Sequence, residues 1–228
     1  NKAEDITRVL YPNDSTWEGK RLRIKQQYVL SSASLQDMLR YFRENHGDEY
    51  ELFPEYMTVQ LNDTHPAMSI PELIRLLMKE GRSFDEAFDI ARRVFAYTNH
   101  TIMSESLERW DMNLLGSVVP EICDILRKIQ EKLQSEHPEL YIIKDNTVHM
   151  SYLSVYMGTS VNGVARIHSD IIRHDIFRDW YAVYPEKFKN VTNGITPRRW
   201  LGLCNPELAS MIADYTGKGF LTDLDRLE

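Results

Sequence analysis

Residues 57–66, Met-Thr-Val-Gln-Leu-Asn-Asp-Thr-His-Pro, decide the fold of this chain. The first five are rich in apolar and β-branched side chains, and they predict a short buried strand. Residues 94–98, Val-Phe-Ala-Tyr-Thr, predict a second strand for the same reason. Helix signals separate the two strands, and strands that alternate with helices are typical of an α/β fold with a parallel sheet. The expected fold class is therefore α/β.

Helix start signals are strong between and after these strands. Ser69 with Glu72, and Ser83 with Glu86, have the spacing of a capping box. Apolar residues that recur every three or four positions predict a long amphipathic helix over 115–133. The other segments expected to be helical in whole or in part are 19–44, 151–157, 163–172, a helix that starts at Thr196 and Pro197, and 205–217.

Polar side chains follow both predicted strands, at the edge where α/β proteins bind their ligands. Asp63 and His65 follow the first strand, and His100 and Thr101 follow the second. A carboxylate and an imidazole in this position can bind the hydroxyl groups of a sugar. The alternative is that Asp63 caps a turn and that His65 makes a structural hydrogen bond. The sequence leaves both interpretations open.

The acidic residues Glu105 and Glu108 raise the question of a glycoside hydrolase, which needs two carboxyl groups across one bond. A helix would place them one turn apart. The neighbouring Arg109 favours ionised carboxylates, which are unsuited to donating a proton. The alternative is that both are surface or supporting charges.

Two later motifs also contain functional side chains. His168, Ser169 and Asp170 invite comparison with a catalytic triad, but the members of a triad usually converge from distant positions, so a structural cluster is the alternative. Residues 193–200, Asn-Gly-Ile-Thr-Pro-Arg-Arg-Trp, place two arginines at a helix start. Such a site attracts a phosphate or carboxylate, or its arginines pair with acidic residues elsewhere in the protein.

The overall composition argues against several classes of partner. The 228 residues carry a net charge of -7, which repels nucleic acids and anionic membranes. Cys123 and Cys204 are expected to be small buried hydrophobic residues, and the histidines lack the spacing of metal ligands. The chain starts at Asn1 rather than at a methionine, and we expect it to be an internal piece of a longer protein.

Five motifs in order resemble the α-glucan phosphorylases, the family of the glycogen, starch and maltodextrin phosphorylases. They are Leu-Tyr-Pro-Asn-Asp at 10–14, Leu-Asn-Asp-Thr-His-Pro-Ala at 61–67, Tyr-Thr-Asn-His-Thr at 97–101, Val-Asn-Gly-Val-Ala-Arg-Ile-His-Ser-Asp at 161–170, and Thr-Asn-Gly-Ile-Thr-Pro-Arg-Arg-Trp at 192–200. The resemblance implies that 1–228 is the second half of a Rossmann-like N-terminal domain, up to the crossover into a C-terminal domain. The whole protein would then be a two-domain, GT-B-like glycosyltransferase.

The resemblance also implies a reaction. Orthophosphate cleaves the terminal α-1,4 link of a glucan and releases glucose 1-phosphate, with pyridoxal phosphate acting through its own phosphate group. The lysine that carries this cofactor belongs to the C-terminal domain, and no segment here resembles it. The chain alone is therefore expected to be inactive, and the full-length enzyme to be a cytoplasmic homodimer.

Individual residues take roles from the same resemblance. His100 and Asn193 would bind the hydroxymethyl group of the glucose, and Trp200 would pack near the cofactor ring. The gate loop, 11–19, would contribute Asn13, Asp14 and Ser15, the last standing where the family often has Asn. The side-pocket residues beside the anomeric centre would be Asp63, His65, Thr101 and Glu108.

Arg40 and Tyr41 correspond to a pair that is Arg-Arg in the animal enzymes, where it helps bind the nucleotide activator and sugar phosphates. A phenol does not replace a guanidinium as a phosphate ligand. The resemblance thus predicts a bacterial-type enzyme without the nucleotide switch.

Two other functions fit the same residues. One is a non-catalytic glucan-binding or regulatory module that retains the sugar-binding face. The other is a two-domain glycosyltransferase that uses nucleotide sugars, which would need a nucleotide-binding carboxylate in its C-terminal half.

Overall fold

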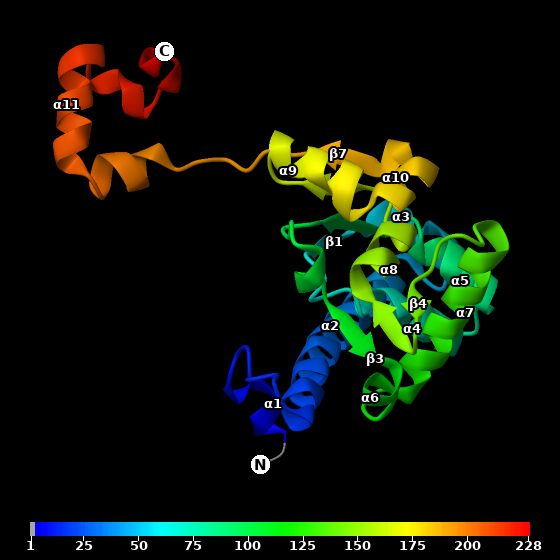
Figure 1. The fold of residues 1–228 in the computed structure, drawn as a ribbon. Helices are drawn as coiled ribbons and strands as arrows, with labels where there is room; N and C mark the ends of the chain where they lie inside the picture. Colours follow the sequence, from blue (N-terminus) through cyan, green and yellow to red (C-terminus); the bar gives the residue numbers. More distant parts are fainter. Residues whose placement is uncertain (1–2) are drawn as a thin grey trace. The chain divides into compact units, whose positions relative to one another are not determined.

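The computed structural model describes residues 3–228 (Figure 1). These residues form two compact units that divide between Val191 and Thr192. The first contains both sheets and the main hydrophobic core, and the second consists of helices and helical turns.

A four-stranded parallel sheet forms the centre of the first unit. Its strands are β1 (Val59–Asn62), β2 (Phe95–Thr98), β6 (Val161–Gly163) and β7 (Phe188–Asn190), in the order β1-β2-β6-β7. Each neighbouring pair is parallel, so the carboxyl ends of all four strands lie at one edge. The structure confirms the predicted α/β class, and β1 and β2 lie within two residues of their predicted starts.

Four longer helices of this unit are α2 (Trp17–His46), α4 (Ser69–Lys79), α5 (Phe84–Ala91) and α7 (Pro120–Glu136). In Figure 1, α2 leads from the N-terminal segment into the body of the unit. Its buried residues, such as Phe42, join one hydrophobic core with residues of the other three helices. Burial of this shared apolar surface is the main force that holds the helices on the sheet.

A second, antiparallel sheet was not predicted from the sequence. It contains β3 (Arg109–Asp111), β4 (Ile143–Lys144) and β5 (Thr147–His149), in the order β3-β5-β4. The loop between β4 and β5 is Asp145-Asn146, with φ angles of 49° and 56°. Two consecutive positive φ angles suit a tight hairpin turn, and Asn and Asp adopt them more readily than most residues.

Short helical segments connect these elements. The α-helices are α1 (Glu4–Arg8), α3 (Phe53–Tyr56), α6 (Met112–Gly116), α8 (Met150–Met157), α9 (Arg166–Ile171) and α10 (Arg178–Val183). The 3₁₀ and π turns of this unit are Tyr50–Leu52, Ser104–Ser106, Ile172–Ile176 and Pro185–Lys187. The predicted helix over 151–157 is confirmed by α8.

The capping predictions have different outcomes. Ser83 and Glu86 form the expected capping box, with each side chain bonded to the other's backbone amide. The box predicted for Ser69 and Glu72 is wrong, because α4 starts without a side-chain cap. The Glu72 carboxylate is fully buried and binds Arg75 instead, at 2.8 Å.

The long helix predicted over 115–133 is divided in the structure. Leu115 lies in α6, which ends at Gly116, and α7 starts only at Pro120. Proline has no amide hydrogen to donate and is favoured in the first turn of a helix, so the new helix begins there. The apolar stripe continues through both helices because both face the same core.

The second unit contains a π turn (Arg198–Leu203), α11 (Pro206–Thr216) and two 3₁₀ turns, Lys218–Leu221 and Leu224–Leu227. The Asn205 side chain caps α11 and Gly217 ends it, as predicted. The expected burial of Cys204 is wrong, because its side chain is exposed, whereas Cys123 is buried.

Candidate functional site

The carboxyl ends of β1 and β2 bring together two of the polar clusters that the sequence indicates. His100 Nε2 lies 2.7 Å from Asn62 Oδ1, so a residue two positions beyond the end of β2 is bonded to the last residue of β1. The parallel register pairs Asn62 with Thr98 and places both loops at the same edge. The Asp63 amide continues this ladder by donating to the Thr98 carbonyl at 2.9 Å.

Asp63 leaves β1 in an unusual backbone conformation. Its φ is 64°, in the left-handed region that residues with a side chain seldom adopt. Its Oδ1 accepts the Thr64 amide at 2.8 Å, which is the kind of local bond that the turn interpretation predicts. Backbone strain of this kind persists where surrounding contacts enforce it, and it is frequent at binding sites.

A pocket of about 300 Å³ opens beside this turn. Five of the residues singled out from the sequence line it, namely Asp14, Asp63, His65, Thr101 and Glu108. They come from the N-terminal loop, the ends of two parallel strands and the segment that leads into β3. The other lining residues are Lys20, Arg23, Thr64, Ser106, Leu107, Arg109 and Trp110.

Glu108 is a largely buried acidic group of this pocket, with 14% of its side chain exposed. Its Oε2 accepts a hydrogen bond of 2.8 Å from Gln27 of α2 and lies 3.7 Å from His65 Nδ1. Its Oε1 is buried without a hydrogen-bond partner in the protein. A buried carboxylate oxygen with free capacity is suited to accept a hydrogen bond from a ligand.

The Nδ1 atom of His65 lies near both a carboxylate and a guanidinium. When the imidazole is neutral, its Nδ1 accepts from Arg23 Nη2 at 3.3 Å, and when it is protonated, Nδ1 donates toward Glu108. The hydrogen bond and charge of Glu108 raise the pKa of His65, whereas burial and the Arg23 charge lower it less. The charge of the pocket therefore depends on pH near neutrality.

The helical pairing expected for Glu105 and Glu108 is wrong. Glu105 belongs to the short 3₁₀ turn Ser104–Ser106, whereas Glu108 lies beyond that turn, immediately before β3. Arg109 also differs from the expectation, because its Nη2 donates to the Ser104 carbonyl at 3.2 Å. The groups around Glu108 are therefore Gln27 and His65.

The N-terminal loop is shaped by its own polar groups. Asn13 Oδ1 accepts the Ser15 amide at 3.0 Å, and α2 begins at Trp17, within the predicted 11–19 loop. The Asn13 carbonyl lies against the Cα of Gly19, where an added Cβ would collide with it. A glycine at this position therefore allows the loop to lie directly on α2.

Asn193 and Trp200 belong to the second unit. Asn193 is exposed, and 64% of Trp200 is exposed. The guanidinium of Arg199 stacks over the Trp200 ring, with its central carbon 5.0 Å from the ring centroid. The structure therefore describes the local conformation of this motif, and its placement beside the pocket stays a prediction.

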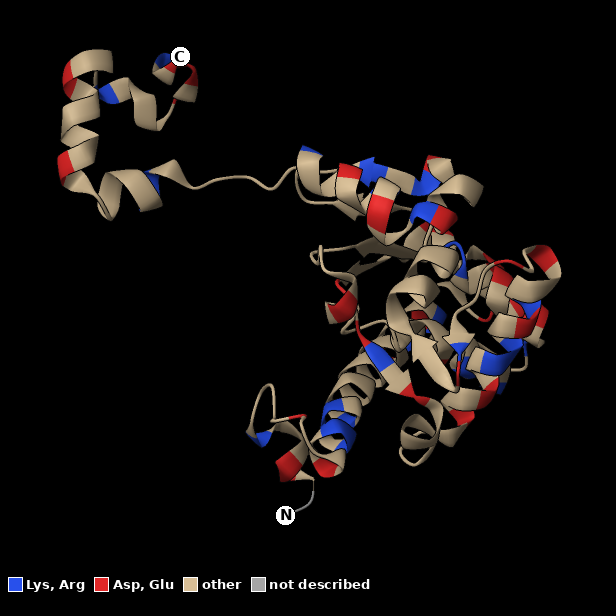
Figure 2. Cartoon of the chain, in the orientation of Figure 1, with Lys and Arg blue, Asp and Glu red and all other residues tan. Residues whose placement is uncertain are grey.

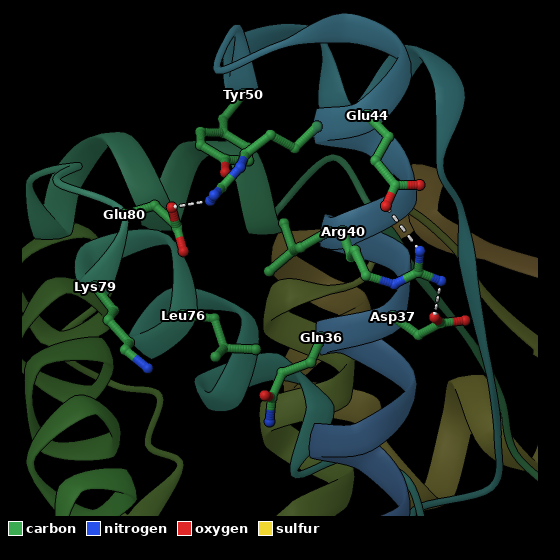
Figure 3. A pocket seen from close by; sticks show the side chains of 10 residues that line it. Gln36, Asp37, Arg40, Glu44, Tyr50, Leu76, Lys79 and Glu80 are labelled. Carbon is green, nitrogen blue, oxygen red and sulfur yellow. Dashed lines mark hydrogen bonds and ion pairs between the residues drawn. The ribbon is translucent and has the colours of Figure 1, made fainter.

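Arg40 and Tyr41 lie on the outer part of α2. Figure 3 shows Arg40 between two carboxylates of its own helix, with Nη2 2.7 Å from Asp37 and Nη1 2.8 Å from Glu44. Arg40 lines a cavity of about 670 Å³ between α2 and α4. Tyr41 is 56% exposed. Two carboxylates thus already compensate the one guanidinium of the pair.

A covalent cofactor site would need a lysine that can reach a ligand. Lys187 has the burial that such a group often has, and burial lowers its pKa to about 8. However, its Nζ donates to the carbonyl groups of Val155 and Tyr156 at the end of α8, at 3.2 and 2.8 Å. It therefore caps a helix, and its surroundings do not fit a Schiff-base lysine.

Within residues 3–228, no group of three or more His, Cys, Asp or Glu side chains is placed to hold a metal ion. No helix in the same range is both long and apolar enough to span a bilayer. In the view of Figure 2, acidic and basic segments are interspersed over the first unit.

Sequence reasoning missed the residues that support this site. Asn62, Gln27 and Asn99 hold His100, Glu108 and the loop after β2, respectively. Asn62 and Asn99 adjoin the predicted polar clusters, so their position was a signal. Gln27 carries no such signal, because it lies 81 residues from Glu108 in the sequence.

The sequence of this chain is similar to those of known proteins. Residues 1–228 match the model of the carbohydrate phosphorylase family. The chain is 44% identical to the brain form of glycogen phosphorylase from Bos taurus over 250 aligned residues, and 43% identical to the muscle form from Homo sapiens over 249. Both alignments cover 100% of this chain and 30% of the relative. The chain therefore belongs to the carbohydrate phosphorylase family.

Proposed function

We propose that the protein containing this chain is an α-1,4-glucan phosphorylase. It uses orthophosphate to remove the terminal glucose of a glucan as glucose 1-phosphate. Two relatives that bear the name glycogen phosphorylase, at 43–44% identity across the chain, support this reaction. The observation that carries the proposal is the pocket at the carboxyl ends of the strands, lined by Asp63, His65, Thr101 and Glu108.

In this proposal the chain supplies one half of a sugar-binding site. His100 and Asn193 bind the hydroxymethyl group of the glucose. The side-pocket residues, Asp63, His65, Thr101 and Glu108, lie beside the anomeric centre. The gate loop controls access through Asn13, Asp14 and Ser15. Oriented polar groups and fixed charges of this kind stabilise a glycosyl cation without a pair of hydrolytic carboxyl groups.

The contacts around two of these side chains support the proposed roles. Asn62 accepts from His100 Nε2, which leaves Nδ1 of the imidazole to accept a hydrogen bond from a sugar hydroxyl. Glu108 is oriented by Gln27 and keeps Oε1 free of protein partners. Both side chains are thus oriented before a sugar arrives, which lowers the entropy lost on binding.

Pyridoxal phosphate belongs to the proposal for the whole protein. When bound, it supplies a phosphate group that exchanges a proton with the substrate phosphate. Trp200 would pack near its ring, whereas the residues that hold it covalently are assigned to the C-terminal domain. On this basis the chain alone is inactive, and the full-length protein is a cytoplasmic homodimer.

Regulation by nucleotides is not part of this proposal. Arg40 is compensated by Asp37 and Glu44, and its neighbour is Tyr41 rather than a second arginine. We expect the phosphorolysis rate of the full-length protein to stay the same when adenosine monophosphate is added at subsaturating substrate. Strong activation would contradict the assignment of a bacterial-type, unregulated enzyme.

The main experiment measures glucose 1-phosphate released from maltodextrin and orthophosphate by the full-length protein loaded with pyridoxal phosphate. The expected result is steady release that falls at least tenfold in His100→Ala, because an oriented sugar contact is lost. Lys79→Ala, remote from this pocket, serves as the matched control and should retain full activity. Glucan binding without phosphorolysis would favour the non-catalytic module, and hydrolysis to free glucose would exclude a phosphorylase.

A further inference from the structure

A buried hydrogen-bond network joins the carboxyl ends of β2 and β6 to α9. Asn99, directly after β2, has 0% of its surface exposed, and His168 of α9 has 6%. His168 Nε2 lies 3.2 Å from Asn99 Oδ1, and the Val164 amide donates to His168 Nδ1 at 3.1 Å. One imidazole therefore bridges two segments that are 69 residues apart in the sequence.

The direction of each hydrogen bond follows from the backbone groups. An amide N–H only donates, so His168 Nδ1 is an acceptor toward Val164 and Nε2 carries the proton. The Thr101 amide donates to Asn99 Oδ1 at 3.0 Å, which makes that oxygen a double acceptor. The Asn99 amide group then donates to the Tyr97 hydroxyl at 2.9 Å. Each member of the network has one allowed orientation.

This network holds the loop that carries two of the proposed sugar contacts. His100 lies between Asn99 and Thr101, and its ring is bonded on the other side to Asn62. Thr101 lines the pocket, and its amide is bonded to the Asn99 side chain. The loop is thus held from the protein interior by Asn99 and at the sheet edge by Asn62.

The neighbours of His168 in the motif have separate partners. Ser169 Oγ lies within hydrogen-bonding distance of the Ala165 carbonyl, at 2.9 Å, and of Asn190 Oδ1, at 2.8 Å. Asp170 pairs with Arg173 at 3.3 Å. The three adjacent residues therefore do not form a catalytic triad, and the His168 imidazole instead makes structural hydrogen bonds.

We propose that His168 is a positioning residue for the sugar-binding edge. It fixes Asn99, which fixes the backbone of His100 and Thr101, and it does not contact the sugar itself. This inference rests on the proposed phosphorylase function for its effect on activity. The geometric part, that His168 orders the loop after β2, stands on the hydrogen bonds alone.

Two isosteric variants separate the two bonds of the imidazole. In His168→Gln the side-chain amide nitrogen takes the position of Nε2 and can still donate to Asn99, but the acceptor for the Val164 amide is lost. In His168→Asn the side-chain amide oxygen takes the position of Nδ1 and can still accept from the Val164 amide, but the donor to Asn99 is lost. Each variant removes one buried hydrogen bond, so similar decreases in thermal midpoint are expected for both.

The kinetic test uses the full-length enzyme loaded with pyridoxal phosphate. We expect His168→Asn to lower kcat/KM for maltodextrin about tenfold to a hundredfold, because the contacts of the loop are misplaced. His168→Gln should stay within about threefold of the wild type, which corresponds to rescue by the variant that retains the donor. The proposal is overturned if both variants lose activity equally, if neither does, or if His168→Gln alone loses it.

Hydrogen exchange separates a failure of this inference from a failure of the proposed function. The Thr101 amide should exchange faster in His168→Asn than in His168→Gln, whether or not the protein is a phosphorylase. If the wild type releases no glucose 1-phosphate, the proposed function fails, and a difference at Thr101 still supports the loop-positioning role. Equal exchange at Thr101 in both variants overturns it.

Discussion

At the scale of single residues, the pocket depends on long-range partners of a few charged groups. His65 lies 3.7 Å from Glu108, and the Glu108 carboxylate is the main reason why the pKa of His65 is raised. The charge of Arg23, whose Nη2 lies 3.3 Å from the same Nδ1 atom, opposes this shift. The pKa of His65 thus depends on how Glu108 and Arg23 are placed around its ring.

Replacing Glu108 by Gln should lower the pKa of His65, because the hydrogen bond to an anion and its charge are both lost. In the native protein the pKa of His65 is raised, so protonation stabilises the fold below the unfolded pKa of about 6.5. That stability is lost as the pH rises through the folded pKa. The variant should therefore be less stable than the wild type in mildly acidic solution, and this difference should shrink toward alkaline pH.

The measurement is an NMR titration of isotope-labelled histidine. Glu105→Gln is the matched control, because Glu105 does not contribute to the His65 shift. An unchanged His65 titration in Glu108→Gln would show that the two side chains do not interact in solution.

At the scale of elements, α2 and α4 are joined by a buried charge cluster. Glu72 of α4 has 0% exposure and accepts two bonds of 2.8 Å from Arg75 and one of 2.6 Å from Ser32 of α2. The Tyr28 hydroxyl donates to it at 3.2 Å. This cluster replaces the predicted capping box at the start of α4, so the acid ties two helices together rather than ending one.

Removing the cation of this cluster should be strongly destabilising. In Arg75→Ala the Glu72 carboxylate stays buried without its counter-ion, which costs about 3–5 kcal/mol of the free energy of unfolding. Arg127→Ala is the control, because its partner Asp124 is exposed and such pairs contribute about 0–1 kcal/mol. Urea unfolding of both variants measures the difference, and equal midpoints would contradict a role for this cluster in stability.

At the scale of the whole molecule, the two units differ in how much core they contain. Residues 192–228 are all described, and of their side chains only Phe220 is buried. Large apolar side chains of this unit remain exposed, including Trp200 at 64%, Leu203 at 76% and Tyr215 at 87%. A segment this short cannot bury enough apolar surface to be stable by itself.

The exposed apolar side chains predict self-association of the 228-residue chain. It should bind the dye 8-anilinonaphthalene sulfonate strongly and elute as oligomers. A shortened chain of residues 1–191 should bind less dye and elute closer to a monomer. Equal dye binding by the two chains would show that the exposed apolar surface responsible for association lies in the first unit instead.

Much of the fold was predictable because its signals are local. The strands β1 and β2, the Ser83 capping box and the Asn205 and Gly217 ends of α11 depend on residues within one or two turns of each other. The motifs also placed Asp63, His65, His100 and Thr101 after β1 and β2, and parallel pairing brings these ends to one edge.

Several hydrogen-bond partners of the site residues lie far away in the sequence and meet them only in the folded chain. The bond of Gln27 to Glu108 spans 81 residues, and that of His168 to Asn99 spans 69. The sequence by itself determined the family, the α/β class and the side chains that follow the strands, since periodicity and local hydrogen bonding are encoded in neighbouring residues. Which buried group meets which depends on how the helices pack on the sheet, and packing is a property of the whole folded unit.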